Sequence, residues 1–476
     1  MKKADVAIIG AGLSGIFAAY GLISARPDLH IVLFEEGEPI ASRSCPIIRG
    51  DVSKCIHCKK CAVMHGFGGA GAFSDGKFNF TAEFGGWLTD YMPASQVMKL
   101  IEDVDAVNVR FGANGPIYST ETPESEVIRR RALSYDIHLL NARCKHLGTE
   151  KNFQVLMNLY EWIDKRIELH CNTTVSSITP MINGKPVLHD EGNVPDSYVL
   201  ETSKGQCACD ILIAAPGRSG SEWFSNICRS LRLPVLNNRV DLGVRVELPA
   251  LVFKDITDAM YEAKLKYMTR VYKDIVRTFC MNPYGYVVAE NTDGIVTVNG
   301  HSYDDPNLRS ENTNFALLVS NRFTEPFKEP NRYGRHIASL SNMLGGGVMV
   351  QRLGDLRDGR RTNEHRMSKS FVKPTLDATP GDLSLVLPKR HLDNILEMIN
   401  VLDKLAPGTA NADTLLYGVE VKFYSARLQL SNTLETGLRN FFAIGDGAGI
   451  TRGLSQAGAS GLLVARSVLE RLDSGK

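Results

Sequence analysis

The sequence predicts an α/β fold in which one domain is assembled from both ends of the chain around a second, α+β domain. Three observations predict it. A short apolar strand, a glycine turn and a helix follow one another from residue 5 onward. A second apolar stretch ends at Gly217, and a third ends at Gly445 before a helix that extends to Leu472. Apolar strands that lead directly into glycine are typical of a buried parallel sheet.

The composition indicates a globular protein of more than one domain. A chain of 476 residues exceeds a single ordinary core, and 43% hydrophobic with 22% charged residues is a globular balance. The net charge of +1 does not favour a nucleic-acid surface. No apolar run approaches the ~20 residues that span a membrane. Because ten cysteines occur without a secretory signal, we expect a cytoplasmic protein with reduced thiols.

The first element is a dinucleotide-binding fingerprint. Residues 5–9 form the predicted strand, and Gly10, Gly12 and Gly15 follow it with the spacing G-x-G-x-x-G. In this pattern the first glycine permits the tight turn, the second lets the backbone approach a pyrophosphate, and the third lets the helix pack on the strand. Glu35 ends the next predicted strand, where an acid can accept the hydroxyl groups of a ribose. The same charge disfavours a 2′-phosphate, and therefore NADP.

The other two strand ends distinguish between nucleotide cofactors. In flavoproteins with two dinucleotide-binding domains, a strand followed by Gly-Asp and a helix places the aspartate on the ribityl chain of FAD; Gly445 and Asp446 match that arrangement. Residues 209–217 resemble the strand that closes the FAD domain in these proteins. The predicted cofactor is FAD, with Gly217, Gly445, Asp446 and Gly453 among its ligands. No second strand-glycine-helix unit is found for a nicotinamide cofactor, although transient docking of NAD(P)H stays open.

The chain as a whole resembles an FAD-dependent dehydrogenase family related to the flavoproteins that include electron-transfer-flavoprotein:quinone oxidoreductase. The resemblance implies a discontinuous FAD-binding Rossmann domain of the glutathione-reductase type, over residues 1–240 and 415–476, and an α+β substrate domain over 241–414. The stretches that carry the resemblance are 68–77 (GGAGAFSDGK), 243–247 (GVRVE), 279–283 (FCMNP), 351–355 (QRLGD), 418–420 (GVE) and 445–453 (GDGAGITRG).

A cysteine cluster over residues 45–61 is inserted after the fingerprint. Cys55, Cys58 and Cys61 have the C-x2-C-x2-C spacing of ferredoxin clusters, and Cys45 precedes a proline upstream. We expect these four to hold a [4Fe-4S] cluster. Three alternatives stay open: a zinc site that includes the cysteines with or without a histidine, a dithiol redox pair, and cysteines that only pack.

A glycine-rich loop over residues 66–77 follows the cluster. Five glycines and two alanines occur in its first eleven positions, a density that costs conformational entropy and favours close approach to a flat ring. Gly69, Gly71 and Ser74 are therefore candidate cofactor ligands. Asp75 and Lys77 are candidate catalytic groups. The alternative is an ordinary surface loop with a turn at Asp75-Gly76.

The region between the predicted domain boundaries is expected to face the substrate. Residues 240–246, 294–298 and 315–320 are predicted strands, and residues 389–405 a predicted amphipathic helix. His301 is its candidate acid or base, because imidazole titrates near neutral pH. The function hypothesis is hydride transfer between FAD and a small organic substrate, with electrons relayed by the cluster to a ferredoxin-like carrier. The alternative is an FAD-binding protein with a zinc-stabilised cysteine knuckle that acts in macromolecule modification or assembly.

Overall fold

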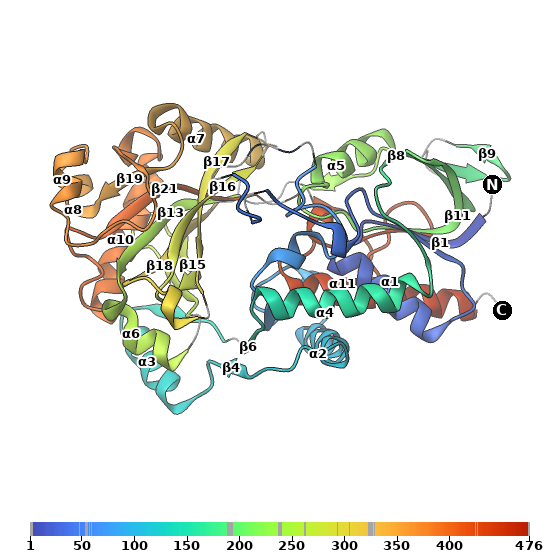
Figure 1. Cartoon of the computed structure of the whole chain (residues 1–476), viewed down its shortest axis with the longest axis horizontal. Helices are drawn as coiled ribbons and strands as arrows, with labels where there is room; N and C mark the ends of the chain where they lie inside the picture. Colours follow the sequence, from blue (N-terminus) through green and yellow to red (C-terminus); the bar gives the residue numbers. More distant parts are fainter. Residues whose placement is uncertain are drawn as a thin grey trace. The chain divides into compact units, whose positions relative to one another are not determined.

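The chain folds into two compact units (Figure 1). The computed structural model describes residues 3–474 except 47, 53–55, 57, 59, 142, 188–193, 237–239, 261–262, 293, 304, 322–326, 328, 424 and 426. The first unit comprises Met1–Ile117, Arg143–Leu236 and Ser425–Lys476; the second comprises Tyr118–Ala142 and Asn237–Tyr424. Among the described residues, no helix is long and apolar enough to cross a membrane.

These units correct the domain boundaries expected from the sequence. The expected substrate domain, residues 241–414, lacks two segments that the second unit contains. Residues 118–142 belong there because they include β5 (Ile137–Leu139), which pairs with β14 (Leu265–Met268). Residues 415–424 belong there because β21 (Leu415–Lys422) pairs on both sides within the second sheet.

The first unit is built on a mixed sheet with the strand order β7-β2-β1-β11-β10-β8-β9. Its parallel part confirms the predicted α/β fold class, and its apolar strands are buried, as β2 and β23 are at every position. The partner of β11 changes along its length, from antiparallel β10 at residues 205–209 to parallel β23 at 212–214. The strands are β1 (Lys3–Ile9), β2 (Ile31–Phe34), β7 (Glu168–His170), β8 (Val175–Ile182), β9 (Lys185–Pro186), β10 (Ser197–Thr202), β11 (Gly205–Ala214) and β23 (Phe441–Ala443).

Helices from distant parts of the sequence pack together in the first unit. Figure 1 shows α1 beside α11, and α11 also packs on α2. The helices are α1 (Leu13–Ala25), α2 (Ala94–Arg110), α4 (Thr149–Asp164), α5 (Ser221–Ser230) and α11 (Leu454–Ser474). The short elements are η1 (Ile40–Ser42), η2 (Gly69–Phe73), β3 (Lys77–Phe80), η3 (Leu88–Asp90), β6 (Arg143–His146), β12 (Val235–Leu236), β22 (Arg427–Leu428) and η6 (Asp446–Ala448); β4 (Ile117–Ser119) spans the boundary between the units in sequence.

The second unit is built on a sheet with the order β20-β19-β21-β13-β18-β15-β14-β5. On β13, Leu242, Val244 and Val246 alternate with polar residues and face a core that includes Ile395 and Ile399 of α10. Such alternation gives an antiparallel sheet one apolar face and one polar face. The remaining strands of this sheet are β13 (Val240–Pro249), β15 (Ile275–Asn282), β18 (Asn312–Asn321), β19 (Met349–Arg352) and β20 (Thr379–Pro380).

The four elements predicted for this region from the sequence are confirmed. They are β13, β17 (Ile295–His301), β18 and α10 (Lys389–Leu405). The hairpin of β16 (Tyr286–Thr292) and β17 is antiparallel. The other elements of the second unit are α3 (Pro123–Leu133), α6 (Ala250–Ala259), η4 (Pro306–Leu308), α7 (Pro330–Gly345), α8 (Leu353–Arg357), α9 (Glu364–Ser368) and η5 (Leu383–Leu385).

Candidate functional site

The glycine turn after β1 has the close packing that its spacing predicts. Gly10 has a φ of +101°, and a Cβ there would lie 2.4 Å from the carbonyl oxygen of Ala215. A Cβ at Gly15 would lie 1.9 Å from the carbonyl oxygen of Gly10. A side chain at either position would collide with backbone, so both glycines are required to join β1 to α1.

Gly12 differs from Gly10 and Gly15 because it faces open space. A Cβ on Gly12 would meet no heavy atom within 4 Å. Gly12 is also the N-cap of α1, and no side chain caps that helix. The unpaired N–H groups at a helix start favour an anion. The turn thus combines an uncapped helix N-terminus with room for a ligand to approach the backbone.

The carboxylate of Glu35 holds three backbone segments together. Its Oε2 accepts the N–H of Ala11 at 2.8 Å, and its Oε1 accepts those of Gly37 and Gly66 at 2.9 Å each. The side chain is buried. Because a carboxylate has about four acceptor positions, these bonds leave Oε2 capacity for one further donor. Glu35 could therefore accept at most one further hydrogen bond from a ribose. Its bonds to three backbone N–H groups give it a structural role as well, which the sequence did not indicate.

The ends of the three predicted strands meet at one edge of the first sheet. β23 and β1 both lie parallel to β11, so their carboxyl ends point the same way. A Cβ on Gly445 would lie 2.5 Å from Oγ of Ser14 in the first turn of α1. The N–H of Gly447 donates to the carbonyl of Pro216 at 2.8 Å. Gly217 is exposed at this edge, and a Cβ there would meet no heavy atom within 4 Å.

Asp446 lies in the connection between β23 and α11. Thr451 Oγ1 donates to Asp446 Oδ1 at 2.7 Å. Burial raises the pKa of the Asp446 carboxyl above its usual range, against the opposing charge of Arg218 and the bond from Thr451. Gly453 then precedes α11, and the N–H of Arg452 donates to the carbonyl of Gly85 at 2.8 Å.

The glycine-rich loop packs against the fingerprint turn. The N–H of Gly68 donates to the carbonyl of Ala11 at 2.8 Å, and a Cβ on Gly69 would lie 3.2 Å from Cα of Gly12. Asn152 Nδ2 and Ser74 Oγ both donate to the carbonyl of Gly71, each at 2.7 Å. The hydroxyl hydrogen of Ser74 is thus used within the loop. Residues 66–77 are therefore held against the start of α1.

Asp75 and Lys77 form a charged cluster with a histidine that the sequence did not single out. Asp75 Oδ2 lies 3.7 Å from Lys77 Nζ and 3.6 Å from His146 Nε2. Lys77 and His146 are register partners on β3 and β6. Because this pairing joins residues almost seventy positions apart, no local pattern at His146 could have indicated it.

His301, the third predicted catalytic residue, belongs to the second unit. It ends β17 opposite Tyr286 of β16. Its ring lies edge-on to the ring of Tyr303, with centroids 4.8 Å apart. The catalytic roles of His301, Asp75 and Lys77 stay predictions.

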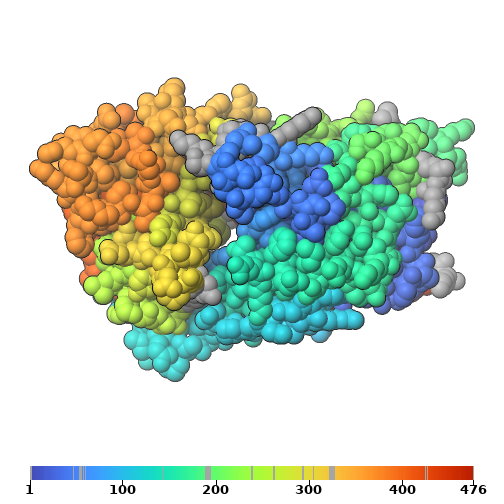
Figure 2. All heavy atoms as spheres, viewed as in Figure 1, coloured from blue at the N-terminus to red at the C-terminus, as the bar shows by residue number. Residues whose placement is uncertain are grey.

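Arg43 holds together the two ends of the cysteine segment, residues 45–61. Its guanidinium donates to the carbonyls of Ala62, Val63 and Phe67, at 3.0, 3.0 and 2.7 Å. Burial lowers the pKa of Arg43 to about 10. In Figure 2 the blue N-terminal segment lies at the displayed surface, beside the atoms of α4.

The predicted metal ligands are only partly described. Cys58 is exposed, Cys45 and Cys61 are half-buried, and Cys55 lies outside the described residues. Among the residues that the structure describes, no group of three or more His, Cys, Asp or Glu side chains could hold a metal ion. The described cysteines therefore give no support to the predicted [4Fe-4S] cluster or to zinc.

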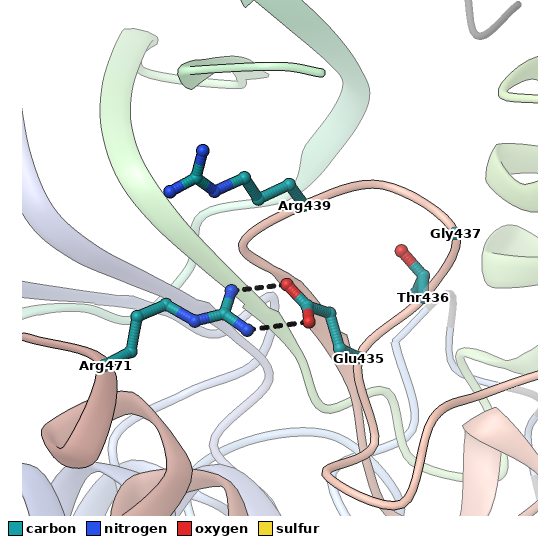
Figure 3. A pocket seen from close by; sticks show the side chains of 5 residues that line it. All are labelled: Glu435, Thr436, Gly437, Arg439 and Arg471. Atoms are coloured by element: carbon teal, nitrogen blue, oxygen red, sulfur yellow. Dashed lines mark hydrogen bonds and ion pairs between the residues drawn. The ribbon is translucent and has the colours of Figure 1, made fainter. Parts of the chain in front are cut away.

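A cavity of about 410 Å³ opens at the opposite edge of the same sheet, before β23 (Figure 3). Its lining includes an ion pair in which the two terminal nitrogens of the Arg471 guanidinium face the Glu435 carboxylate (Figure 3), with Nη2 and Oε2 2.8 Å apart. Arg471 Nη1 also donates to Asn440 Oδ1 at 2.7 Å. These bonds hold the loop before β23 in place. Because the cavity lies where β23 begins, it is separate from the edge at which β1, β11 and β23 end.

The first unit thus has the architecture of a nucleotide-binding α/β domain, with its turns and glycine loop gathered at one edge. Residues 240–423, which lie within the second unit, match the family model described as "FAD-dependent protein, C-terminal domain-like". An uncharacterized protein of Clostridium beijerinckii is 26% identical over 493 residues, which cover 99% of this chain and 82% of that relative.

Solved structures give weaker likenesses. Glycine oxidase from Geobacillus kaustophilus has a TM-score of 0.38 and 14% identity, over 99% of this chain and 95% of that one. A variant of E. coli quinol fumarate reductase FrdA has a TM-score of 0.40 and 14% identity, over 100% of this chain and 71% of that one. At these TM-scores neither likeness bears on function.

Proposed function

We propose that this protein is an FAD-dependent oxidoreductase that acts on a small organic molecule. One observation carries the proposal: the open, uncapped start of α1 at Gly12 lies against the glycine-rich loop, at the edge where β1, β11 and β23 end. A dinucleotide needs such an edge, because its phosphates require backbone N–H groups and close approach. The match of residues 240–423 to a domain of FAD-dependent proteins supports FAD as the dinucleotide.

Different residues of the first unit would hold different parts of the cofactor. The start of α1 would hold the pyrophosphate, and Glu35 Oε2 has capacity for one ribose hydroxyl. Asp446 would supply a half-buried carboxyl for the ribityl hydroxyls. When bound, FAD supplies hydride transfer at its flavin ring. Asp75, Lys77 and His146 form the acid–base group that can hold or pass a proton beside the glycine loop.

The test compares one charge at two helix starts. Gly12→Asp places an acid where the pyrophosphate is proposed, at a position with room for a side chain. Ala94→Asp is the matched control, since it adds the same charge at the start of α2, which no side chain caps. We expect about one FAD per wild-type chain and at least about tenfold weaker FAD binding for Gly12→Asp only. Equal binding by both variants, or a wild type that binds no FAD, would overturn the proposal.

The predicted electron relay is a finer proposal that rests on cysteine spacing. Cys45, Cys55, Cys58 and Cys61 would hold a [4Fe-4S] cluster that passes single electrons to a ferredoxin-like carrier. Anaerobic purification with iron, sulfide and zinc analysis tests it. About four irons per chain, lost in Cys58→Ser, supports the relay. Zinc without iron supports the zinc-stabilised cysteine knuckle. A chain that contains neither metal refutes both the [4Fe-4S] cluster and the knuckle.

A further inference from the structure

The cavity before β23 is lined by residues from two parts of the sequence. Four lie on the loop before β23 and one lies near the end of α11: Glu435, Thr436, Gly437, Arg439 and Arg471. All of them belong to the first unit. Two guanidinium groups and one carboxylate give this lining a formal charge of +1. The balance favours a negatively charged ligand.

The acceptor groups of the lining are largely used within the protein. Glu435 Oε2 accepts from Arg471 Nη2 at 2.8 Å, and Oε1 accepts from Arg471 Nη1 and from the N–H of Asn440. Because a carboxylate has about four acceptor positions, these bonds leave about one. The hydroxyl of Thr436 donates to the carbonyl of Leu438 at 3.3 Å and accepts its N–H at 3.1 Å. The lining thus has few acceptors to offer a ligand.

Arg471 is fixed in place, yet part of its guanidinium stays available. Its Nη1 also donates to Asn440 Oδ1 at 2.7 Å, and its Cζ lies 5.4 Å from the centroid of the Phe442 ring. With the bonds to Glu435, these contacts use both N–H groups of Nη1 and one of Nη2. Among the described residues, no acceptor is paired with Nε or with the second N–H of Nη2. These two N–H groups are adjacent and form an edge that can donate to two oxygens of one oxyanion.

Arg439 has a fixed backbone and a side chain that the loop does not use. Its carbonyl accepts the hydroxyl of Tyr198 at 2.5 Å, and the carbonyl of Asn440 accepts the N–H of Leu212 at 2.9 Å. Within the part of the chain that the structure describes, the exposed guanidinium of Arg439 forms no hydrogen bond or ion pair. In Figure 3 the side chains of Arg439 and Glu435 extend from the loop in the same direction, on the side that faces Arg471. Arg439 therefore supplies the charge that the lining leaves unbalanced.

We propose that the cavity before β23 is a binding site for an oxyanion, either a carboxylate or a phosphate. An oxyanion supplies the acceptors that the lining lacks, and it could accept from the free edge of Arg471 and from the Arg439 guanidinium together. Because the backbone of Arg439 and the side chain of Arg471 are already fixed, binding would cost little conformational freedom. The site goes beyond the proposed function, since FAD is expected where β23 ends and the cavity lies where β23 begins.

The test measures binding of succinate and of inorganic phosphate to the purified full chain by calorimetry, with excess FAD and at constant ionic strength set with NaCl. Arg439→Gln removes one charge from the lining, at a side chain that makes no bond to the described residues. Arg131→Gln is the matched control, because Arg131 is exposed on α3 and does not line the cavity. We expect about one oxyanion per wild-type chain, at least about tenfold weaker binding by Arg439→Gln, and wild-type binding by Arg131→Gln.

Succinate binding alone identifies a carboxylate site, phosphate binding alone a phosphate site, and binding of both a general oxyanion site. No binding of either, or equal binding by wild type and Arg439→Gln, would overturn the proposal. If Arg439→Gln does not fold, wild-type crystals soaked in selenate decide: an anomalous peak beside Arg439 and Arg471 supports the site, and its absence refutes it.

The flavin content of the same samples separates this site from the proposed cofactor site. Wild type and Arg439→Gln should contain equal amounts of flavin. A variant that loses its flavin would overturn the oxyanion site, because the cavity would then belong to the cofactor. A wild-type chain that binds an oxyanion but no flavin would refute only the proposed FAD.

Discussion

Replacing Glu35 by Gln separates the structural role of this residue from its predicted role at a ribose. The carboxylate accepts from Ala11, Gly37 and Gly66. In Gln, the amide oxygen can keep the two donors at Oε1, whereas the NH2 group then faces the N–H of Ala11. One charge-assisted bond of about 2 kcal/mol is lost, and two others weaken by roughly 0.5 kcal/mol each. The expected loss of unfolding free energy is therefore about 3 kcal/mol.

The assay is urea unfolding of the chain after its cofactor has been removed, since a ribose contact cannot contribute there. Glu38→Gln is the matched control, because Glu38 is exposed on the same connection and its carboxylate accepts one bond, from Asn172. We expect a change below about 0.5 kcal/mol for this control. A Glu35→Gln chain as stable as the control, yet defective in FAD binding, would refute the structural role.

Two further predictions concern Arg43 and His391. Three carbonyls in fixed positions accept from the Arg43 guanidinium. Arg43→Lys should therefore lower the unfolding free energy by about 2–3 kcal/mol in urea unfolding. A stability equal to wild type would contradict a stabilising role for these three bonds. Burial lowers the pKa of His391 to about 4, from 6.5. Since the unfolded chain then binds the proton more readily, stability falls as the pH drops from about 6.5 to 4, by up to about 3 kcal/mol. Unfolding free energies of His391→Leu across this range should lose that part of the slope, and an unchanged slope would exclude His391 as its source.

Local patterns in the sequence predicted the turns better than the contacts made by distant residues. The glycine spacing predicted the turn at Gly10, because a tight strand-to-helix turn depends on adjacent residues. It could not predict that Glu35 would bind Gly66, since folding alone brings these residues together. The same holds for His146 beside Asp75.

The domain boundary at residue 415 failed for a related reason. The apolar run that begins at Leu415 is indeed a strand, β21. Which sheet a strand joins depends on its partners, and β21 lies between β13 and β19 of the second unit.

The packing of α1 on α11 has a consequence for how the protein is made. The first unit needs β23 and α11, which follow all of the second unit in the chain. A nascent chain that has not passed residue 425 leaves the apolar surface of α1 uncovered, although the glycine turn beside it was synthesised first. The second unit, by contrast, can complete its sheet once β21 has emerged. The first unit is therefore completed last during synthesis. A chain truncated before α11 would expose the apolar surface of α1, which chaperones and proteases recognise.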